Sequence, residues 1–114
     1  MNKEQITFEE FLELEKKLEI RIGQIVVAER IPKSKKLLKL TVIFGETESD
    51  VRTVVTNLGD KFEPEAFLML NMPFIMNLTP STMMGVQSQA MIMVAENPDG
   101  LINLDNYNVG SKLM

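Results

Sequence analysis

The sequence predicts a mainly-β domain, a five-stranded Greek-key barrel with a short N-terminal helix and a C-terminal extension. Three observations lead to this fold class. The first segment has helical periodicity, whereas five later segments place apolar residues at every second position. A glycine interrupts the first of these five, and a short helical segment separates the third from the fourth. With 114 residues, 45% of them apolar, the chain is expected to form one domain.

The N-terminal helix is predicted at about residues 8–18. Thr7 followed by Glu10 has the spacing of a capping box, in which each side chain accepts a hydrogen bond from the other residue's backbone N–H. One face of the helix is apolar and contains Phe11, Leu14 and Leu18. Charged residues occupy the opposite face, so the segment is predicted to be an amphipathic helix.

The next three segments alternate with a period of two and are predicted strands. The first includes residues 20–27, where Gly23 interrupts the alternation and predicts a bulge or sharp bend. Residues 38–44 alternate after an intervening turn, and residues 51–57 follow a polar hairpin loop. These strands form the first part of the predicted barrel.

Two further strands are expected around residues 68–76 and 90–95. Residues 58–65 predict a turn and a short helical piece before the fourth strand. A polar loop at residues 77–89 separates the fourth strand from the fifth. This order of elements is that of the oligonucleotide/oligosaccharide-binding (OB) fold.

The domain boundaries follow from these elements. The single domain, residues 1–114, divides into the helix at 1–18, the barrel at 19–96 and the extension at 97–114. Within the extension, the run Asn-Pro-Asp-Gly at residues 97–100 predicts a turn, and residues 101–104 are a candidate short strand.

Composition removes most kinds of catalytic and metal chemistry. The sequence has no cysteine and no histidine, which excludes disulfides, thiolate nucleophiles, Ser-His-Asp triads and imidazole metal sites. No acid-base constellation is visible among the remaining carboxylates, lysines and arginines. We therefore expect a protein that is not an enzyme and has no metal and no cofactor.

Charge is distributed unevenly along the chain. The net charge is −4, from 12 basic and 16 acidic residues. Five basic residues lie between positions 30 and 39 with no acidic residue among them: Arg30, Lys33, Lys35, Lys36 and Lys39. This run falls on the connection between the first two strands, one of the loops through which OB folds hold their ligands. It predicts contact with a polyanion, and a solvated turn is the alternative interpretation.

Residues 66–95 contain no charged residue. Asparagine, proline, serine and threonine interrupt this stretch, so it lacks the run of about 20 apolar residues that a membrane-spanning helix needs. The N-terminal MNKEQITFEEF is acidic and lacks the apolar core of a secretion signal. No membrane association and a cytoplasmic location are expected.

Residues 18–95 resemble the tRNA-binding domain family. The matching blocks are LEIRIGQIVVAERIPKSKKLLKLTVIFG, RTVVTNL and NLTPSTMMGVQSQAMIMVAE. The third block is the most specific, because Asn-Leu-x-Pro is followed in it by Met-x-Gly-x-x-Ser-x-x-Met. The family includes stand-alone bacterial tRNA-binding proteins, C-terminal domains of many methionyl-tRNA synthetases and eukaryotic synthetase-associated cofactors.

The resemblance implies an OB barrel that binds the elbow of tRNA by shape, with little reading of its sequence. It also implies that stand-alone members are homodimers and names an aminoacyl-tRNA synthetase as a candidate partner. This chain departs from the family pattern after Asn77: where Lys or Arg is usual it has Thr79, Ser81 and Thr82, and the usual glycine before the last methionine is Ala90.

Four residues of the third block are candidate RNA contacts: Asn77, Ser88, Gln89 and Met91. In the functional interpretation, Asn77 and Ser88 form neutral hydrogen bonds to ribose or phosphate, and Met91 offers a polarizable packing surface. In the structural alternative, Asn77 caps a turn, Ser88 satisfies a loop carbonyl and Met91 fills the core. The predicted tRNA-binding set combines these four with Arg30, Lys33, Lys35 and Lys36.

Seven of the nine methionines lie between Met69 and Met93. Methionine-rich surfaces bind diverse proteins, and one branch of the family is described as a secretion chaperone that binds peptides. A chaperone-like peptide-binding module with weak or lost RNA binding is therefore the alternative function. Barrel core and a dimer seam are the structural explanation of the same residues.

A homodimer is expected because one small barrel cannot cover every apolar segment of this chain. The helix face, the methionine-rich stretch and the tail residues Leu101, Ile102 and Leu104 all need partners, and large exposed apolar patches are rare on monomers. The helix and residues 97–114 are expected to contribute much of the seam. A two-fold axis would also place two basic loops on one particle.

Overall fold

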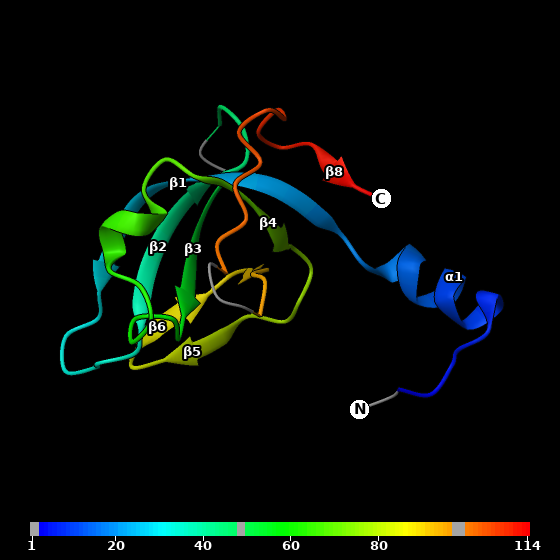
Figure 1. Cartoon of the computed structure of the whole chain (residues 1–114), viewed down its shortest axis with the longest axis horizontal. Coiled ribbons are helices and arrows are strands. Elements are labelled where there is room, and N and C mark those ends of the chain that lie inside the picture. Colours follow the sequence, from blue (N-terminus) through cyan, green and yellow to red (C-terminus); the bar gives the residue numbers. More distant parts are fainter. Residues whose placement is uncertain (1–2, 48–49, 97–99) are drawn as a thin grey trace.

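The computed structural model describes residues 3–47, 50–96 and 100–114. Figure 1 shows a curled antiparallel sheet with one helix, α1, standing beside it. Strands β1 to β3, a short 3-10 helix η2 and strands β4 to β8 follow α1 in that order. The predicted mainly-β class, the N-terminal helix and the OB-like barrel are confirmed. The turn predicted at residues 97–100 falls on residues 97–99, which lie outside the described residues.

Helix α1 spans Phe8–Lys17. The predicted capping box is present: the backbone N–H of Glu10 donates to Thr7 Oγ1 at 3.1 Å, and the N–H of Thr7 donates to Glu10 Oε1 at 3.1 Å. None of the helical residues is buried, and the side chains of Phe8 and Phe11 are 72% and 47% exposed. The helix therefore adds little to the core of its own chain.

The main sheet has the strand order β3-β2-β1-β4-β7, and β8 also pairs with β1. Its strands are β1 Ile20–Arg30, β2 Leu38–Ile43, β3 Val51–Thr56, β4 Asn71–Ile75, β7 Met91–Ile92 and β8 Lys112–Leu113. All pairs are antiparallel. Because β1 pairs with β4 through its first half and with β2 through its second half, the sheet curls around the core.

The irregularity in β1 lies at a different position from the predicted one. The register between β1 and β2 shifts between Ile25 and Val27, so the bulge is there and its prediction at Gly23 is wrong. Gly23 pairs regularly with β4, and a Cβ at this position would lie 2.5 Å from the Phe44 ring and 2.6 Å from Val42 Cγ1. Glycine is needed because two core side chains pack directly on its backbone.

The core fills the inside of the curled sheet. Strand β2 alternates as predicted and buries Leu38, Leu40 and Val42 completely. Phe44 and Phe74 pack edge to face, with ring centroids 5.4 Å apart. The helical piece predicted at residues 58–65 is found later, as η2 at Pro64–Phe67, and it inserts the fully buried Phe67 into the core.

A second, two-stranded sheet lies within the segment predicted as a loop at residues 77–89. Strand β5, Ser81–Met83, pairs with β6, Val86–Ser88. The two residues between the strands, Met84 and Gly85, have φ values of 50° and 81°. Positive φ at both central positions is the geometry of a type I′ turn, which matches the twist of a two-residue hairpin.

The C-terminal extension is held along the first strand of the barrel. The N–H of Ile22 donates to the Ser111 carbonyl at 2.9 Å, and the N–H of Gly110 donates to the Ile22 carbonyl at 2.7 Å. The strand expected at residues 101–104 is absent from this described segment, and β8 provides the pairing instead. Short backbone ladders of this kind leave little signal in the sequence.

Candidate nucleic-acid interface

The loop that joins β1 to β2, residues 31–37 and here called the basic loop, presents three lysines. Lys33, Lys35 and Lys36 are exposed, and none of them forms an ion pair with a described residue. The loop is shaped from within, since Ser34 Oγ accepts hydrogen bonds from the N–H groups of Lys36 at 3.3 Å and Leu37 at 3.0 Å. Uncompensated like charges held on one loop favour binding of a polyanion.

The two ends of the basic run are paired within the chain. Arg30 Nη1 donates to the Gly59 carbonyl at 2.9 Å, and its Nη2 lies 3.0 Å from Glu63 Oε2. Lys39 Nζ lies 3.9 Å from Glu29 Oε1. The run therefore separates into two anchoring residues in β1 and β2 and three loop lysines whose charges are uncompensated by the described residues.

Ser88 and Gln89 connect β3 to the segment that follows the hairpin. The buried hydroxyl of Ser88 accepts from the Val55 N–H at 2.9 Å and donates to the Ala90 carbonyl at 3.0 Å. Gln89 Oε1 accepts from the Thr53 N–H at 2.8 Å, and the Gln89 N–H donates to the Thr53 carbonyl at 2.8 Å. These bonds close the barrel beside β3, which is an end strand in the order of the main sheet.

Arg52 reinforces this closure, although sequence reasoning did not single it out. Its Nη1 donates to the Met76 carbonyl at 2.7 Å and to the Gln89 carbonyl at 3.0 Å, which ties the ends of β4 and β7 to β3. The available signal was a lone charge in the otherwise uncharged strand VRTVVT. We call Arg52, Ser88 and Gln89 the barrel clasp.

Asn77 joins the helix to the barrel. Its Oδ1 accepts from the Glu19 N–H at 2.9 Å, and its Nδ2 donates to the carbonyl of Lys17, the last residue of α1. These contacts match the structural interpretation of Asn77 as a capping residue. Contacts of Asn77, Ser88 and Gln89 with RNA stay predictions, and they must be compatible with the bonds that these side chains already make.

A mostly apolar groove with two methionines, Met83 and Met91, lies between β3, the β5–β6 hairpin and β7, and the polar residues Thr56 and Asn57 also line it. Its walls contain Val55, Leu58, Met83, Met91, Ile92 and Val94. Met91 is 52% exposed, so its side chain faces the groove and the solvent instead of filling the core. This groove offers an apolar surface next to a basic loop, a combination that suits either nucleobases or peptides.

The basic loop and the hairpin turn lie at one end of the barrel, at the lower left of Figure 1. Both border the loop after β3. The N–H of Gly59 in that loop donates to the Lys36 carbonyl at 2.7 Å, while Asn57 and Leu58 line the groove together with Met83. We call this region the loop end. It brings lysines and methionines that are distant in sequence to one face of the molecule.

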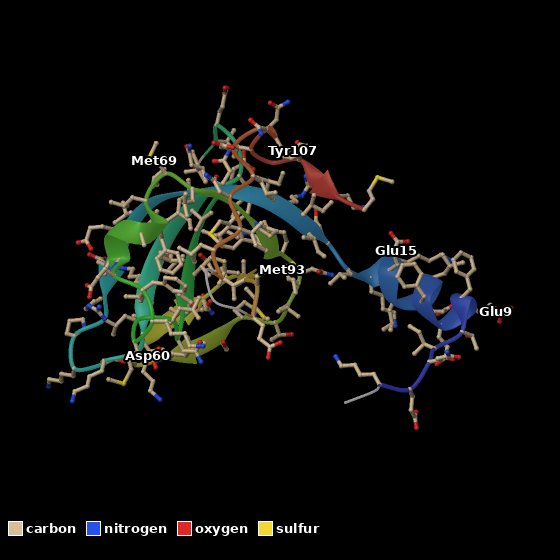
Figure 2. All side chains as sticks on the ribbon, viewed as in Figure 1. Glu9, Glu15, Asp60, Met69, Met93 and Tyr107 are labelled. Atoms are coloured by element: carbon tan, nitrogen blue, oxygen red, sulfur yellow. The ribbon has the colours of Figure 1, made fainter. Side chains whose placement is uncertain are left out.

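Figure 2 gives the position of the loop end relative to other exposed groups. Asp60 lies at this end of the barrel, whereas Met69 lies at the opposite end of the view. Helix α1 and β8 lie at the other side of the sheet, where β1 begins. The lysine-bearing surface is thus separate from the exposed apolar face of the helix.

Comparison with known proteins supports the sequence resemblance. The family model described as "Putative tRNA binding domain" matches residues 20–111, most of the chain. The chain belongs to this tRNA-binding domain family. The basic loop, the groove and the clasp all lie within the matched region, so they are parts of the tRNA-binding domain itself.

A methionine–tRNA ligase of Cytophaga hutchinsonii is 42% identical to this tRNA-binding domain over 98 residues, 86% of the chain. The chain spans 13% of the length of that ligase. A MetRS related protein from Pyrococcus horikoshii has the same fold, with a TM-score of 0.81 and 32% identity over 98% of this chain and 100% of that one. A CsaA chaperone protein from Picrophilus torridus shares the fold at 20% identity, with a TM-score of 0.78 and coverage of 96% and 100%.

Metal sites and membrane-spanning helices are two other features that a chain of this size could contain. Within residues 3–47, 50–96 and 100–114, no three acidic side chains lie close enough together to hold a metal ion. None of the helices in the described part of the chain is long and apolar enough to cross a bilayer.

Proposed function

We propose that this chain is a non-catalytic tRNA-binding module that holds the elbow of tRNA by its shape. The observation that carries the proposal is the set of exposed lysines on the basic loop, which form no ion pair with any described residue, in a chain that is otherwise acidic. Lys33, Lys35 and Lys36 contact phosphates, and Arg30 fixes the root of their loop while offering its remaining donors. Phosphate contacts of this kind position RNA without reading its sequence.

The third sequence block supplies the uncharged part of the proposed interface. Met91 presents its exposed side chain to the RNA, and Gln89 and Asn77, which are exposed as well, offer polar atoms beside it. Ser88 acts from beneath, because its buried hydroxyl fixes the segment that carries Met91. Uncharged donors suit recognition of ribose and bases better than recognition of phosphate alone.

The proposed module is a cytoplasmic homodimer that acts either as a stand-alone tRNA-binding protein or as an accessory of a methionyl-tRNA synthetase. Support for the dimer comes from the exposed apolar face of α1, where Leu14 is 61% exposed, and from Leu113 of β8, which is 38% exposed. Both elements lie near the start of β1, away from the loop end. A two-fold seam there would leave both basic loops free for one tRNA.

The test replaces Lys33, Lys35 and Lys36 by Glu and measures retention of unfractionated tRNA in a gel shift at two salt concentrations. The parent chain should bind more weakly as salt increases, because phosphate binding releases counterions. The triple variant should lose tRNA and keep the parent's unfolding midpoint, since exposed loop charges contribute little to stability.

A control replaces Lys3 and Lys16 by Glu, which makes two-thirds of the same change in net charge at exposed sites outside the basic loop and outside β8. This control should keep most of the tRNA affinity. Equal retention of tRNA by the triple loop variant and the parent would exclude the basic loop as the site. Equal losses of tRNA binding in the loop variant and the control variant would show that the net charge of the chain, and not the basic loop, determines binding.

The second candidate function is a chaperone-like module that binds peptides. The groove that contains Met83 and Met91 favours it, because flexible thioether side chains adapt to varied apolar partners. The fold is shared with CsaA proteins, and at 20% identity that likeness concerns the fold alone. Salt separates the two functions, since binding of an apolar peptide should not weaken steeply with added salt, whereas tRNA binding should.

A further inference from the structure

We infer that Met84, at the tip of the β5–β6 hairpin, is an apolar contact of this domain with the face of a nucleobase. The inference rests on the proposed tRNA-binding function and names a further contact for it. The base would be one whose face is open, at a loop or at the end of a stacked helix. The lysines of the basic loop would hold the flanking phosphates and so bring the base to the tip.

The first observation is the backbone of the turn. Met84 has a φ of 50° and Gly85 a φ of 81°. In a type I′ turn both positions are usually Asn, Asp or Gly, because a larger side chain is disfavoured in the left-handed region. A methionine in that conformation therefore weakens the hairpin relative to asparagine, and strained residues of this kind collect at functional sites.

The second observation is the surroundings of the tip. Met84 is 57% exposed, and a Cβ built on Gly85 would meet no atom within 4 Å. The turn thus borders open space at Gly85, and more than half of the Met84 surface is accessible to a partner. Of the two turn residues, Met84 is the one whose side chain can insert into a partner.

The third observation is the chemistry of the neighbouring surface. The hairpin belongs to residues 66–95, which carry no charge, while the basic loop at the same end carries three unpaired lysines among the described residues. A partner that suits both must combine negative charge with an apolar surface. RNA does so, because its phosphates are anionic and the faces of its bases are its apolar surface. A polarizable thioether packs well on such a face.

The experiment replaces Met84 by Asn and uses Met69→Asn as its matched control. Met69 is also an exposed methionine with positive φ, at 61% and 65°, and it lies away from the loop end (Figure 2). Both substitutions put asparagine where the left-handed region favours it, so neither should lower the unfolding midpoint. Neither changes the charge of the chain.

Binding of unfractionated tRNA is measured by gel shift over a series of salt concentrations. Met84→Asn should raise the dissociation constant about fivefold, within the range expected for loss of one thioether–ring contact. The slope of log Kd against log salt should stay that of the parent, because no phosphate contact is removed. Met69→Asn should leave both the dissociation constant and the slope unchanged.

The outcomes separate this inference from the proposed function. A parent chain that binds no tRNA overturns both. A parent that binds tRNA, with the Met84→Asn variant binding equally well, overturns the inference alone, as would equal losses in the Met84→Asn and Met69→Asn variants. A reduced and carboxymethylated unfolded protein serves as a second probe: if Met84→Asn weakens only its binding, the tip contacts polypeptides and the inference is wrong.

Discussion

The hydroxyl group of Ser88 has two partners inside the barrel, and neither is on its own hairpin partner strand. It accepts from the N–H of Val55 and donates to the carbonyl of Ala90. Because Ser88 is only 6% exposed, water cannot easily replace either bond. One side chain thus satisfies two backbone groups at the place where β3 lacks a ladder partner, which makes it a structural residue whatever its relation to RNA.

Ser88→Ala should therefore lower the free energy of unfolding by about 1–3 kcal/mol, the cost of an unsatisfied buried donor. Urea denaturation measures the change. The control is Ser81→Ala, because Ser81 pairs with Ser88 across the hairpin but is exposed, and this variant should stay within about 0.5 kcal/mol of the parent. A Ser88→Ala variant with unchanged stability and weakened tRNA binding would contradict the structural role and favour direct contact.

For single residues, the distribution of charge could be read from the sequence, whereas the contacts of each side chain could not. The three lysines were recognisable because charge imbalance is visible without knowing any contact. The partners of Ser88 and Asn77 were not, because Val55 lies 33 positions from Ser88 and Glu19 lies 58 positions from Asn77. Motif residues alone do not reveal which backbone groups they serve.

Among the elements, α1 has the least support from the rest of the chain. Its 10 residues include none that is buried, so its stability depends on its own caps. Isolated helices of this length are marginal in water. The Thr7–Glu10 capping box at one end and the Asn77 amide at the other thus have a large share in keeping it folded.

Thr7→Ala should reduce the helical circular dichroism signal at low protein concentration, where self-association is least, because the lost cap is worth about 0.5–2 kcal/mol. The unfolding midpoint of the barrel, followed in urea by the amide NMR signals of buried strand residues such as Leu40 and Val54, should not move. Thr82→Ala, in the exposed hairpin, is the control for loss of a threonine and should change neither signal. A lower barrel midpoint in Thr7→Ala would show that α1 packs on the barrel.

The elements that the sequence predicted are those with strong local signals. The capping box located α1, and alternation located β2 with its buried Leu38 and Leu40. The hairpin of β5 and β6 was hidden because each strand has only three residues and several are polar. Strand β8 was hidden for a similar reason: its two residues are exposed, and only backbone pairing to β1 defines it.

For the molecule as a whole, the two proposed interfaces lie at different ends. Exposed lysines and the hairpin tip lie at the loop end, and the exposed apolar face of α1 lies beyond the start of β1. A dimer formed through α1 would therefore not cover the basic loops. Binding of one tRNA by two loops would increase affinity through effective concentration.

Replacing Phe11 and Leu14 by Glu should convert the proposed homodimer into a monomer, because two charges would enter an apolar seam. Light scattering at micromolar concentration should give the 12.9 kDa monomer mass for this variant and about twice that mass for the parent. Glu9→Gln with Glu13→Gln, on exposed positions of the same helix, is the control and should stay dimeric. A monomeric parent would contradict the proposed dimer. A monomeric variant that binds tRNA as tightly as the parent would contradict the proposed contribution of dimerisation to tRNA affinity.

The pairing of Ile20 with Leu113 also bears on how the barrel folds. Strand β1 begins early in the sequence, yet it pairs with β4 some fifty residues later and with β8 near the end of the 114 residues. Contacts this distant in sequence need large loops to close before they stabilise anything, which slows folding. The β1–β2–β3 meander, whose pairs are local, is the natural nucleus, and docking of the C-terminal segment is expected as the last kinetic step. Lys112 and Leu113 of β8 thus determine how long the start of β1 stays without its β8 partner during folding.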